Sequence, residues 1–470
     1  MSGPFGSTAW MANPASGFYG HTVDNSVRFE TGSNGNLTHT LGTAGNLKLN
    51  TTSYWFKRSV IGTDQYFFAS GASLNTNYSN STVILIDSED KWQIYQESGG
   101  SQALYLKMTQ LLRDTSAWYH IVIAFDTAQS TAANRIKVYL NGVQVTSWAT
   151  ENYGSQDLDT HIMAAATRRW GRGQTDGYIN ANLAQICQIS GAALTPSSFG
   201  EFKNDIWIPK NLTGLTYAAG SYLLELKNSG VGTASSSTVG ADTSGNDLHF
   251  TSVGLAVQDH LPDSPTNNFA TYNAVDNPEG AILSEGNLKC TSNAAYDVVL
   301  GTIPFSSGKY YWEQNATSGN AVDSLSVATT AIDPDKRGSN TGGSVHSVAY
   351  YAGNGGTGSI YWNNAQHVGG TTGWAAGDVM SLACDMDNKT IQFRKNNSLI
   401  YTASSDANGN ITNTWNDMIP AWSIGSGVAG KGSVVNFGQD SSFAGQETAQ
   451  GNTDENGIGD FYYAPPSGYL

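Results

Sequence analysis

Two short stretches of the chain alternate apolar and polar residues in the same way. In residues 135–148, "RIKVYLNGVQVTSW", the alternation runs up to Asn141-Gly142 and resumes after it. A period of two places one set of side chains on each face of a β-strand. Asn-Gly between two such runs favours a type I′ turn, because both central residues then need a positive φ. We therefore predict a β-hairpin here, and a second over 390–402, "TIQFRKNNSLIYT", which carries Asn-Asn at the corresponding place.

Each predicted hairpin follows an apolar run that contains a tryptophan and ends at an aspartate. These runs are "AWYHIVIAFD" at 117–126 and "GWAAGDVMSLACDMD" at 373–387. Strands that are apolar on both faces suit the centre of a sheet with material packed on each side. Further short strand candidates recur at roughly ten-residue intervals with turn residues between them, as in β-sandwiches. The pattern predicts an all-β chain with two sandwiches of related design.

The same pattern divides the chain into four parts. The stretch 259–269, "DHLPDSPTNNF", contains two prolines and marks the expected boundary between the sandwiches. The predicted parts are an N-terminal arm at 1–20, a first sandwich at 21–262, a second sandwich at 263–445 and an irregular C-terminal tail at 446–470.

One short helix is predicted within the first sandwich, over 194–203, "LTPSSFGEFK". Thr195 is a suitable N-cap and Pro196 fits the first helical position. Near the C-terminus, Pro465-Pro466 argues against a terminal helix or strand.

The charge and the cysteines exclude several classes of function. A net charge of −15 argues against binding to nucleic acid and against a polybasic membrane surface, both of which need a basic face. No run of 18 apolar residues is present, so membrane insertion is not expected. Cys187, Cys290 and Cys384 are too few and too scattered for a disulfide framework, and we expect free, buried thiols. Calcium binding by acidic loops such as 87–90 stays open as the only cofactor considered.

The sequence offers little support for catalysis. The eight histidines are scattered, which disfavours a zinc site. A glycosidase needs two carboxylates facing the scissile bond, and no strand carries a suitable row of them. Recognition is the remaining option, because aromatic rings on loops can stack on sugars. Trp362 and Trp415 are the candidate glycan-binding residues, whereas Trp170 and Trp374 are expected to serve as core residues.

Both sandwiches resemble known families. The first block resembles laminin-G-like, concanavalin A-like domains through "SYWFKR" (53–58), "AWYHIVIAFD", "KVYLNG" and "DGYINANLAQI" (176–186). The second resembles the SPRY domain through "SGKYYWE" (307–313), "GDVMSLACDMDNKTIQFRKNN" and "PAWSIGSGVAGKGSVVNFGQ" (420–439). The resemblances imply two concanavalin A-like jelly-roll β-sandwiches in tandem.

The combination of the two, with "WIPK" (207–210), "DSPTNNFATYN" (263–273) and "GIGDFYYAPPSGYL" (457–470), resembles structural proteins of tailed-phage virions, many of them tail fibres. This implies a virion appendage that binds a host surface receptor or glycan. It also implies other virion proteins as partners and a homo-oligomer, with a trimer favoured. A capsid decoration, head fibre or tail adaptor without a receptor role stays open, as does, more remotely, a polysaccharide depolymerase. No coiled-coil shaft is predicted.

The arm at 1–20 is rich in Gly, Pro and Ser and yet carries four aromatic residues, namely Phe5, Trp10, Phe18 and Tyr19. A plain linker seldom contains so many aromatic residues. We therefore predict that these four side chains anchor the protein to the virion.

Overall fold

The computed structural model describes residues 18–72, 74, 79–173, 177–277, 280–293, 298–317, 323–329, 347–352, 357–362, 365–404, 417–424 and 429–470. These residues form β-sheets joined by loops and short 3₁₀ helices, and they contain no α-helix. The chain divides into two compact units, one ending at Asn268 and the other beginning at Phe269. The all-β prediction of two tandem sandwiches is confirmed.

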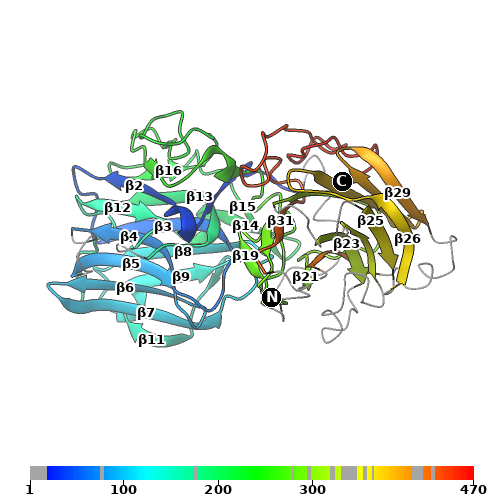
Figure 1. Ribbon diagram of the computed structural model, residues 1–470. Helices are drawn as coiled ribbons and strands as arrows, with labels where there is room; N and C mark the ends of the chain where they lie inside the picture. The colour runs from blue at the N-terminus through cyan, green and yellow to red at the C-terminus, as the bar shows by residue number, and fades with distance from the viewer. Residues whose placement is uncertain are drawn as a thin grey trace. The chain divides into compact units, whose positions relative to one another are not determined.

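The unit that ends at Asn268 contains two large antiparallel sheets (Figure 1). The first sheet has the order β10 (Val143–Gln144), β9 (Ile136–Leu140), β8 (Tyr119–Asp126), β3 (Leu49–Arg58), β13 (Ala181–Ser190), β1 (Ser26–Phe29) and β18 (His260–Leu261), with β16 (Tyr222–Leu224) also paired to β13. The second sheet has the order β11 (Trp148–Asn152), β7 (Ser101–Leu111), β6 (Lys91–Ser98), β5 (Asn80–Ile86), β4 (Gln65–Gly71), β12 (Thr167–Trp170), β2 (Asn36–Thr40) and β17 (Thr251–Val253). The 3₁₀ helices η3 (Thr31–Ser33), η4 (Ala132–Asn134), η5 (Pro196–Ser198) and η6 (Val257–Asp259) lie in the connections.

The core of this unit is built from the alternate residues of both sheets, as the period of two requires. Trp92 and Trp170 of the second sheet are fully buried in it. The Trp92 indole N–H donates to the hydroxyl of Tyr54 (2.9 Å), and that of Trp170 donates to Tyr222 (2.8 Å). Both indoles thus bury their large apolar rings without leaving a polar atom unpaired. The expectation that Trp170 is a core residue is confirmed.

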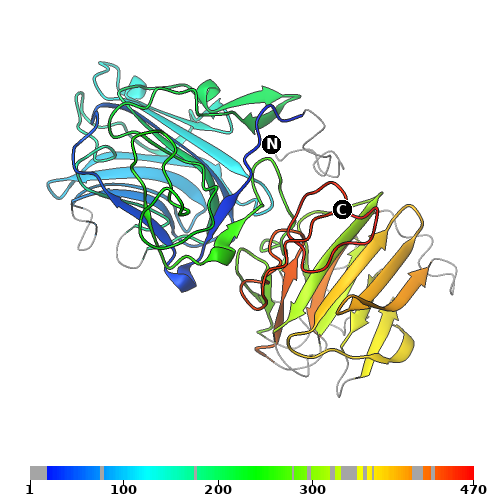
Figure 2. The same ribbon diagram turned by 90° about the horizontal axis from the view of Figure 1, so that it is seen from above.

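The outer face of the first sheet is covered by the chain itself. Val122, Cys187 and Ile189 point outward from the sheet and pack against Phe199 and Leu212 of the segment that follows it. Figure 2 shows these long connections, in green, lying against the strands. The central strands β3, β8 and β13 of the first sheet are therefore buried on both faces.

The predicted helix over 194–203 is wrong. Residues Pro196–Ser198 form only the 3₁₀ helix η5, and the chain then continues as β14 (Gly200–Lys203), paired with β15 (Ile206–Pro209). Asn204 and Asp205, between these strands, have φ values of 48° and 61°. An Asn-Asp pair tolerates this left-handed conformation, so the segment forms a tight hairpin instead of extending the helical turn.

The two hairpins predicted from the sequence are confirmed. Asn141 and Gly142 have φ values of 48° and 81° between β9 and β10. Asn396 and Asn397 have φ values of 46° and 64° between β28 (Thr390–Lys395) and β29 (Ser398–Ser404). Both pairs have the two positive φ values that a type I′ turn requires.

The unit that begins at Phe269 contains two further sheets. The third sheet has the order β19 (Ile282–Ser284), β20 (Lys289–Thr291), β31 (Gly432–Asn436), β22 (Lys309–Ala316), β27 (Val379–Asp385), β28 and β29. The fourth sheet has the order β21 (Val298–Leu300), β30 (Met418–Ile424), β23 (Asp323–Thr329), β24 (Ser347–Tyr351), β25 (Thr357–Trp362) and β26 (Ala365–Thr372). Trp374, 3% exposed, belongs to the core between them, as predicted.

The C-terminal segment 446–470 is irregular in backbone, as the sequence predicted, yet it is fixed to the outer face of the third sheet. Phe461 and Tyr469 pack against Tyr311 of β22. The last residue exchanges backbone hydrogen bonds with that strand, because Leu470 accepts from the N–H of Tyr311 (2.8 Å) and donates to Lys309 (3.0 Å). This segment is the covering layer of the third sheet.

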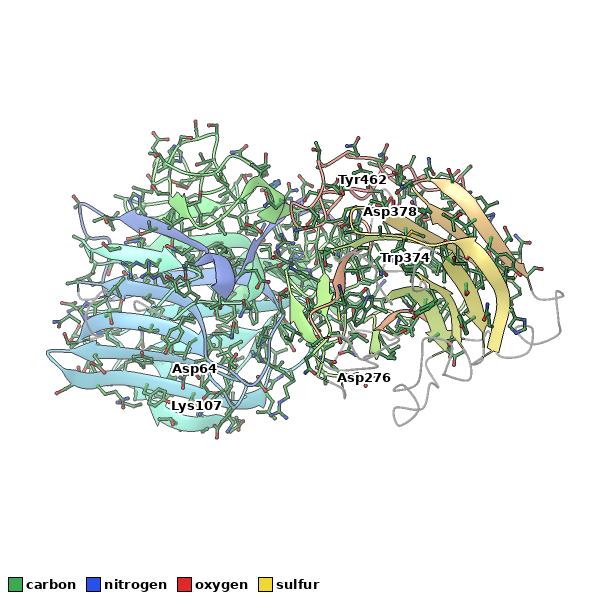
Figure 3. The ribbon with its side chains drawn as sticks, viewed as in Figure 1. Asp64, Lys107, Asp276, Trp374, Asp378 and Tyr462 are labelled. Carbon is green, nitrogen blue, oxygen red and sulfur yellow. The ribbon has the colours of Figure 1, made fainter. Side chains whose placement is uncertain are left out.

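A buried glutamate, Glu313 of β22, holds the same segment. Its carboxylate accepts hydrogen bonds from the backbone N–H groups of Tyr462 (2.8 Å) and Tyr463 (2.7 Å). The Tyr311 hydroxyl (3.0 Å) and the Asn436 amide (3.1 Å) complete the set of donors. Figure 3 labels Tyr462 on this segment. Burial raises the pKa of Glu313 to about 7, although the four donors act in the opposite direction.

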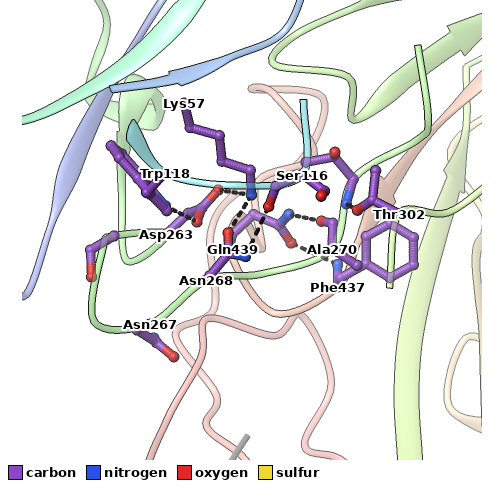
Figure 4. Close-up of polar contacts among 12 residues, drawn as sticks. Lys57, Ser116, Trp118, Asp263, Asn267, Asn268, Ala270, Thr302, Phe437 and Gln439 are labelled. Atoms are coloured by element: carbon purple, nitrogen blue, oxygen red, sulfur yellow. Dashed lines mark hydrogen bonds and ion pairs between the residues drawn. The ribbon is translucent and has the colours of Figure 1, made fainter. Parts of the chain in front are cut away.

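The boundary between the units is fixed on each side by buried polar contacts (Figure 4). On the N-terminal side, the Lys57 ammonium contacts Asp263 (3.0 Å) and Asn268 (2.8 Å). The side chains of Lys57 and Asp263 are only 3% and 2% exposed. On the C-terminal side, the carbonyl of Ala270 accepts from Gln439 (2.7 Å). Residues 263–268 thus belong to the first sandwich, whereas the sequence assigned 263 onward to the second.

Replacing Asp263 with alanine should destabilise the first sandwich by about 3–5 kcal/mol, because it leaves the buried Lys57 ammonium without its carboxylate. Chemical denaturation of the full chain measures this change. The matched control is Asp157→Ala, which breaks the exposed Lys48–Asp157 pair (3.3 Å) and should cost less than about 1 kcal/mol. Equal effects of the two substitutions would show that the Asp263 pair does not stabilise the fold.

The stability of the second sandwich should fall as the pH rises from about 4.5 to about 7. Over this window the unfolded chain has ionised Glu313, while the folded chain still holds the proton at a site whose pKa is about 7. The stabilisation from the protonated Glu313 is complete below the pKa of the unfolded chain and is lost as the pH rises through the pKa of the folded chain. Between these two pKa values the free energy of unfolding should fall by up to about 1.4 kcal/mol per pH unit.

Urea midpoints of the full chain at several pH values measure this slope. Glu313→Gln should flatten it, and it should also lower stability, since an amide N–H₂ would face a backbone N–H. Glu447→Gln, on the same C-terminal segment, is the control and should keep the slope. An unchanged slope in Glu313→Gln would show that Glu313 does not cause the pH dependence of stability.

Candidate functional site: the outer face of the second sheet

The outer face of the second sheet is defined by the cross-strand register. Two rows of outward residues cross the sheet. One row is Thr38, Arg169, Ala69, Val83, Tyr95, Tyr105 and Asn152; the other is Tyr66, Leu85, Gln93, Lys107 and Thr150. Directly opposed side chains on one face lie close enough to interact, so each row forms a continuous strip. We call this surface the tyrosine face.

The centre of the tyrosine face is apolar. Ala69, Val83 and Leu85 are at most 3% exposed, and Leu74 from the β4–β5 connection packs on them. The rings of Tyr66 and Tyr95 border this cluster and remain half-buried. An apolar floor with partly exposed aromatic rings at its edge presents flat surfaces to a ligand.

Next to the apolar centre lies a group of aromatic and amide side chains. The rings of Tyr95 and Tyr105 meet edge to face with centroids 6.3 Å apart. The Tyr105 hydroxyl donates to the amide oxygen of Gln93 (2.7 Å). Burial raises the pKa of Tyr105, so its hydroxyl keeps its proton at neutral pH. This part of the face combines ring surfaces with a hydroxyl and an amide, which are the groups that recognise sugars through their C–H faces and hydroxyls.

A charged corner completes the tyrosine face at the β5–β6 turn. The Lys107 ammonium contacts Asp87 (2.5 Å) and Glu89 (2.7 Å), and Lys91 also contacts Glu89 (3.0 Å). Hydrogen bonding to Lys107 and Lys91 lowers the pKa of Glu89 to about 2, and the same contacts raise the pKa of Lys107. Asp64 lies beside this turn and accepts from the backbone N–H of Ser88 (2.8 Å; Figure 3). Glu89 and Lys107 are therefore both charged at neutral pH.

The β5–β6 turn that carries Asp87 and Glu89 is itself held by buried contacts. Asp90, 1% exposed and with a φ of 65°, accepts hydrogen bonds from Arg58 (3.0 Å) and Arg113 (2.7 Å). The neighbouring Asp87 accepts the backbone N–H groups of Glu89 and Lys91, each at 3.0 Å. The charged corner is thus a rigid part of the sheet rather than a flexible loop tip.

Of the residues predicted as binding or anchoring sites, the structure describes Phe18, Tyr19 and the backbone of Trp362. Phe18 and Tyr19 pack edge to face (5.0 Å), and Lys203 of β14 lies over the Phe18 ring at 5.3 Å. Both are half-buried on their own domain. The backbone of Trp362 belongs to β25. Phe5, Trp10 and Trp415 lie outside the described residues.

Two further expectations concern absent features. Among the described residues, no group of three or more His, Cys, Asp or Glu side chains is arranged to hold a metal ion. In the same part of the chain, no helix is long and apolar enough to span a membrane. Cys187, Cys290 and Cys384 are buried and form no disulfide bond.

Sequence reasoning missed the tyrosine face, although part of the signal is present. The stretches "KWQIYQ" (91–96) and "ALYLKM" (103–108) alternate, with Gln93, Tyr95, Tyr105 and Lys107 on the polar side. The missing information is the register. It shifts at irregularities in the β4–β5 and β6–β7 pairs, and local patterns do not specify such shifts.

Comparison with known families agrees with the fold of the two units. Residues 24–196 match the concanavalin A-like lectin/glucanases superfamily in its laminin G form, and residues 309–440 match the SPRY domain. The chain therefore carries a laminin G-like, concanavalin A-like domain followed by a SPRY domain, both of them binding-type domains. No curated protein sequence matches the chain.

Among solved structures, the chain is similar to the SPRY domain of human HERC1, with 19% identity over 33% of this chain and 91% of that one (TM-score 0.27). It is similar to the native heptameric SAP-like pentraxin from Limulus polyphemus, with 19% identity over 37% and 80% (TM-score 0.29). It is also similar to domains LG4-5 of the mouse laminin alpha1 chain, with 9% identity over 88% and 89% (TM-score 0.30). These similarities carry no argument about function.

Proposed function

We propose that this protein is a virion appendage of a tailed phage, a tail fibre or spike, and that its tyrosine face binds a glycan of the host surface. The observation that supports glycan binding is the surface itself: half-buried tyrosine rings, an amide and charged groups share one outer face of a rigid sheet. Rigid scaffolds with adaptable surface groups are typical of recognition domains. The phage origin rests on the sequence resemblance alone.

The remaining parts of the proposal follow from the same resemblance. The protein assembles as a homo-oligomer, with a trimer favoured, and contacts other virion proteins through the arm at 1–20. Several copies of a weak sugar site would then act together, because avidity multiplies the effect of modest single-site affinities. A capsid decoration, head fibre or tail adaptor is the alternative function, without a receptor site.

Replacing Tyr95 and Tyr105 together with alanine should weaken glycan binding at least about tenfold, since loss of two stacking surfaces removes more than about 1.4 kcal/mol. A glycan array followed by titration of the best ligand measures this. The control is Tyr139→Ala, a half-buried tyrosine of β9 that packs on the outer side of the first sheet; it should bind like the unmodified chain.

Three outcomes separate the alternatives. Loss of binding only in the tyrosine-face variant supports the proposal. Glycan binding that survives this variant would place the sugar site elsewhere. If the unmodified chain binds no glycan yet is present in purified particles, the structural role without a receptor is the better account.

A further inference from the structure

The chemistry of the charged corner bears on which glycans the tyrosine face accepts. Lys107 and Lys91 are the ammonium groups beside Tyr105 and Gln93, and both are engaged by carboxylates at 3.0 Å or less. With Asp64 beside the same turn, and with Asp90 paired to Arg58 and Arg113, this corner holds four carboxylates and four cations, and each cation is already engaged by a carboxylate. A ligand bound at Tyr95 and Tyr105 would lie next to this corner, because the row with Gln93 and Lys107 adjoins theirs.

The other cation of the two rows lies too far away to change this balance. Arg169 is in the same row as Tyr95 but three strands removed, at about 14 Å for a strand spacing of about 4.8 Å. This distance exceeds the screening length of about 8 Å at physiological salt. Its guanidinium also donates to the carbonyl of Gly173 (3.4 Å).

An acidic sugar would therefore meet only cations that are already paired with carboxylates at this corner. To pair with Lys107, its carboxylate would have to displace Glu89 and also Asp87, whose carboxylate is held by the backbone N–H groups of the β5–β6 turn. The net charge of −15 on the whole chain adds an unfavourable field at longer range. A neutral sugar, by contrast, can stack on the tyrosine rings without any charge penalty.

We propose that the tyrosine face selects uncharged glycans and rejects acidic ones, and that Asp87 and Glu89 set this selectivity by neutralising Lys107. These two residues are specificity determinants of the site; they do not form the stacking surface.

This selectivity rests on the glycan-binding function proposed above, and its test therefore uses both neutral and acidic ligands. Neutral dextran and galactomannan, and acidic polygalacturonate and alginate, are immobilised, and binding of the full chain is measured at low and high salt. The unmodified chain should bind a neutral polymer with little dependence on salt. It should bind the acidic polymers at least about tenfold more weakly.

The double substitution Asp87→Asn with Glu89→Gln removes the two negative charges that pair with Lys107. The side-chain oxygen at position 87 can still accept the backbone N–H groups of residues 89 and 91. It should strengthen binding to acidic polymers at low salt by about tenfold, lose that gain at high salt, and leave neutral binding in place. Glu89→Gln alone, at an exposed position, should give a smaller gain in the same direction and remains informative if the double variant is unstable. Glu201→Gln is the control, since it breaks a similar ion pair with Lys210 (3.5 Å) on the hairpin β14–β15.

A preference of the unmodified chain for acidic polymers would overturn the proposed selectivity while leaving the glycan site standing. The selectivity would also be overturned if the double variant and Glu89→Gln both bound the acidic polymers no more strongly than the unmodified chain. Failure of the unmodified chain to bind any polysaccharide, neutral or acidic, would overturn the glycan site itself and the selectivity with it.

Discussion

A β-sandwich buries only one face of each sheet against its partner, and the structure of this chain depends on how it treats the outer faces. Outward apolar residues must be covered, or else outward positions must be polar. The first sheet covers its outer face with the segment that contains Phe199 and Leu212. The third sheet uses the C-terminal segment with Phe461 and Tyr469. The second sheet completes its outer face with tyrosines, an amide and charged groups of its own strands, which makes that face available for recognition.

The two covering segments are stabilised in different ways. On the first sheet the contacts are mainly apolar, whereas on the third sheet a single buried carboxylate, Glu313, accepts four hydrogen bonds from groups on both the segment and the sheet. Hydrogen bonds to an ionised carboxylate are stronger than neutral ones, but burial favours the protonated form of Glu313 more, so its pKa is raised to about 7. An irregular stretch with two prolines and many glycines thereby becomes a fixed layer of the domain.

Local features of this fold follow from the sequence, whereas the site does not. Asn141-Gly142 and Asn396-Asn397 determine their own φ values, so both hairpins could be predicted from a few residues. Asn204-Asp205 has the same property, and overlooking it led to a predicted helix where the chain forms β14 and β15. The tyrosine face requires residues from strands far apart in sequence to align across several registers. That alignment is decided by turns, bulges and packing together, and no single stretch of sequence contains it.

We propose that the tyrosine face is where ligand binds. Photoaffinity labelling tests it most directly, with a diazirine-bearing form of the best glycan ligand and mapping of the labelled peptides. The label should appear on peptides that contain Tyr66, Tyr95 or Tyr105, and an excess of unlabelled ligand should suppress it. Competable label confined to residues 269–470, or to the covering segment of the first sheet, would contradict the claim.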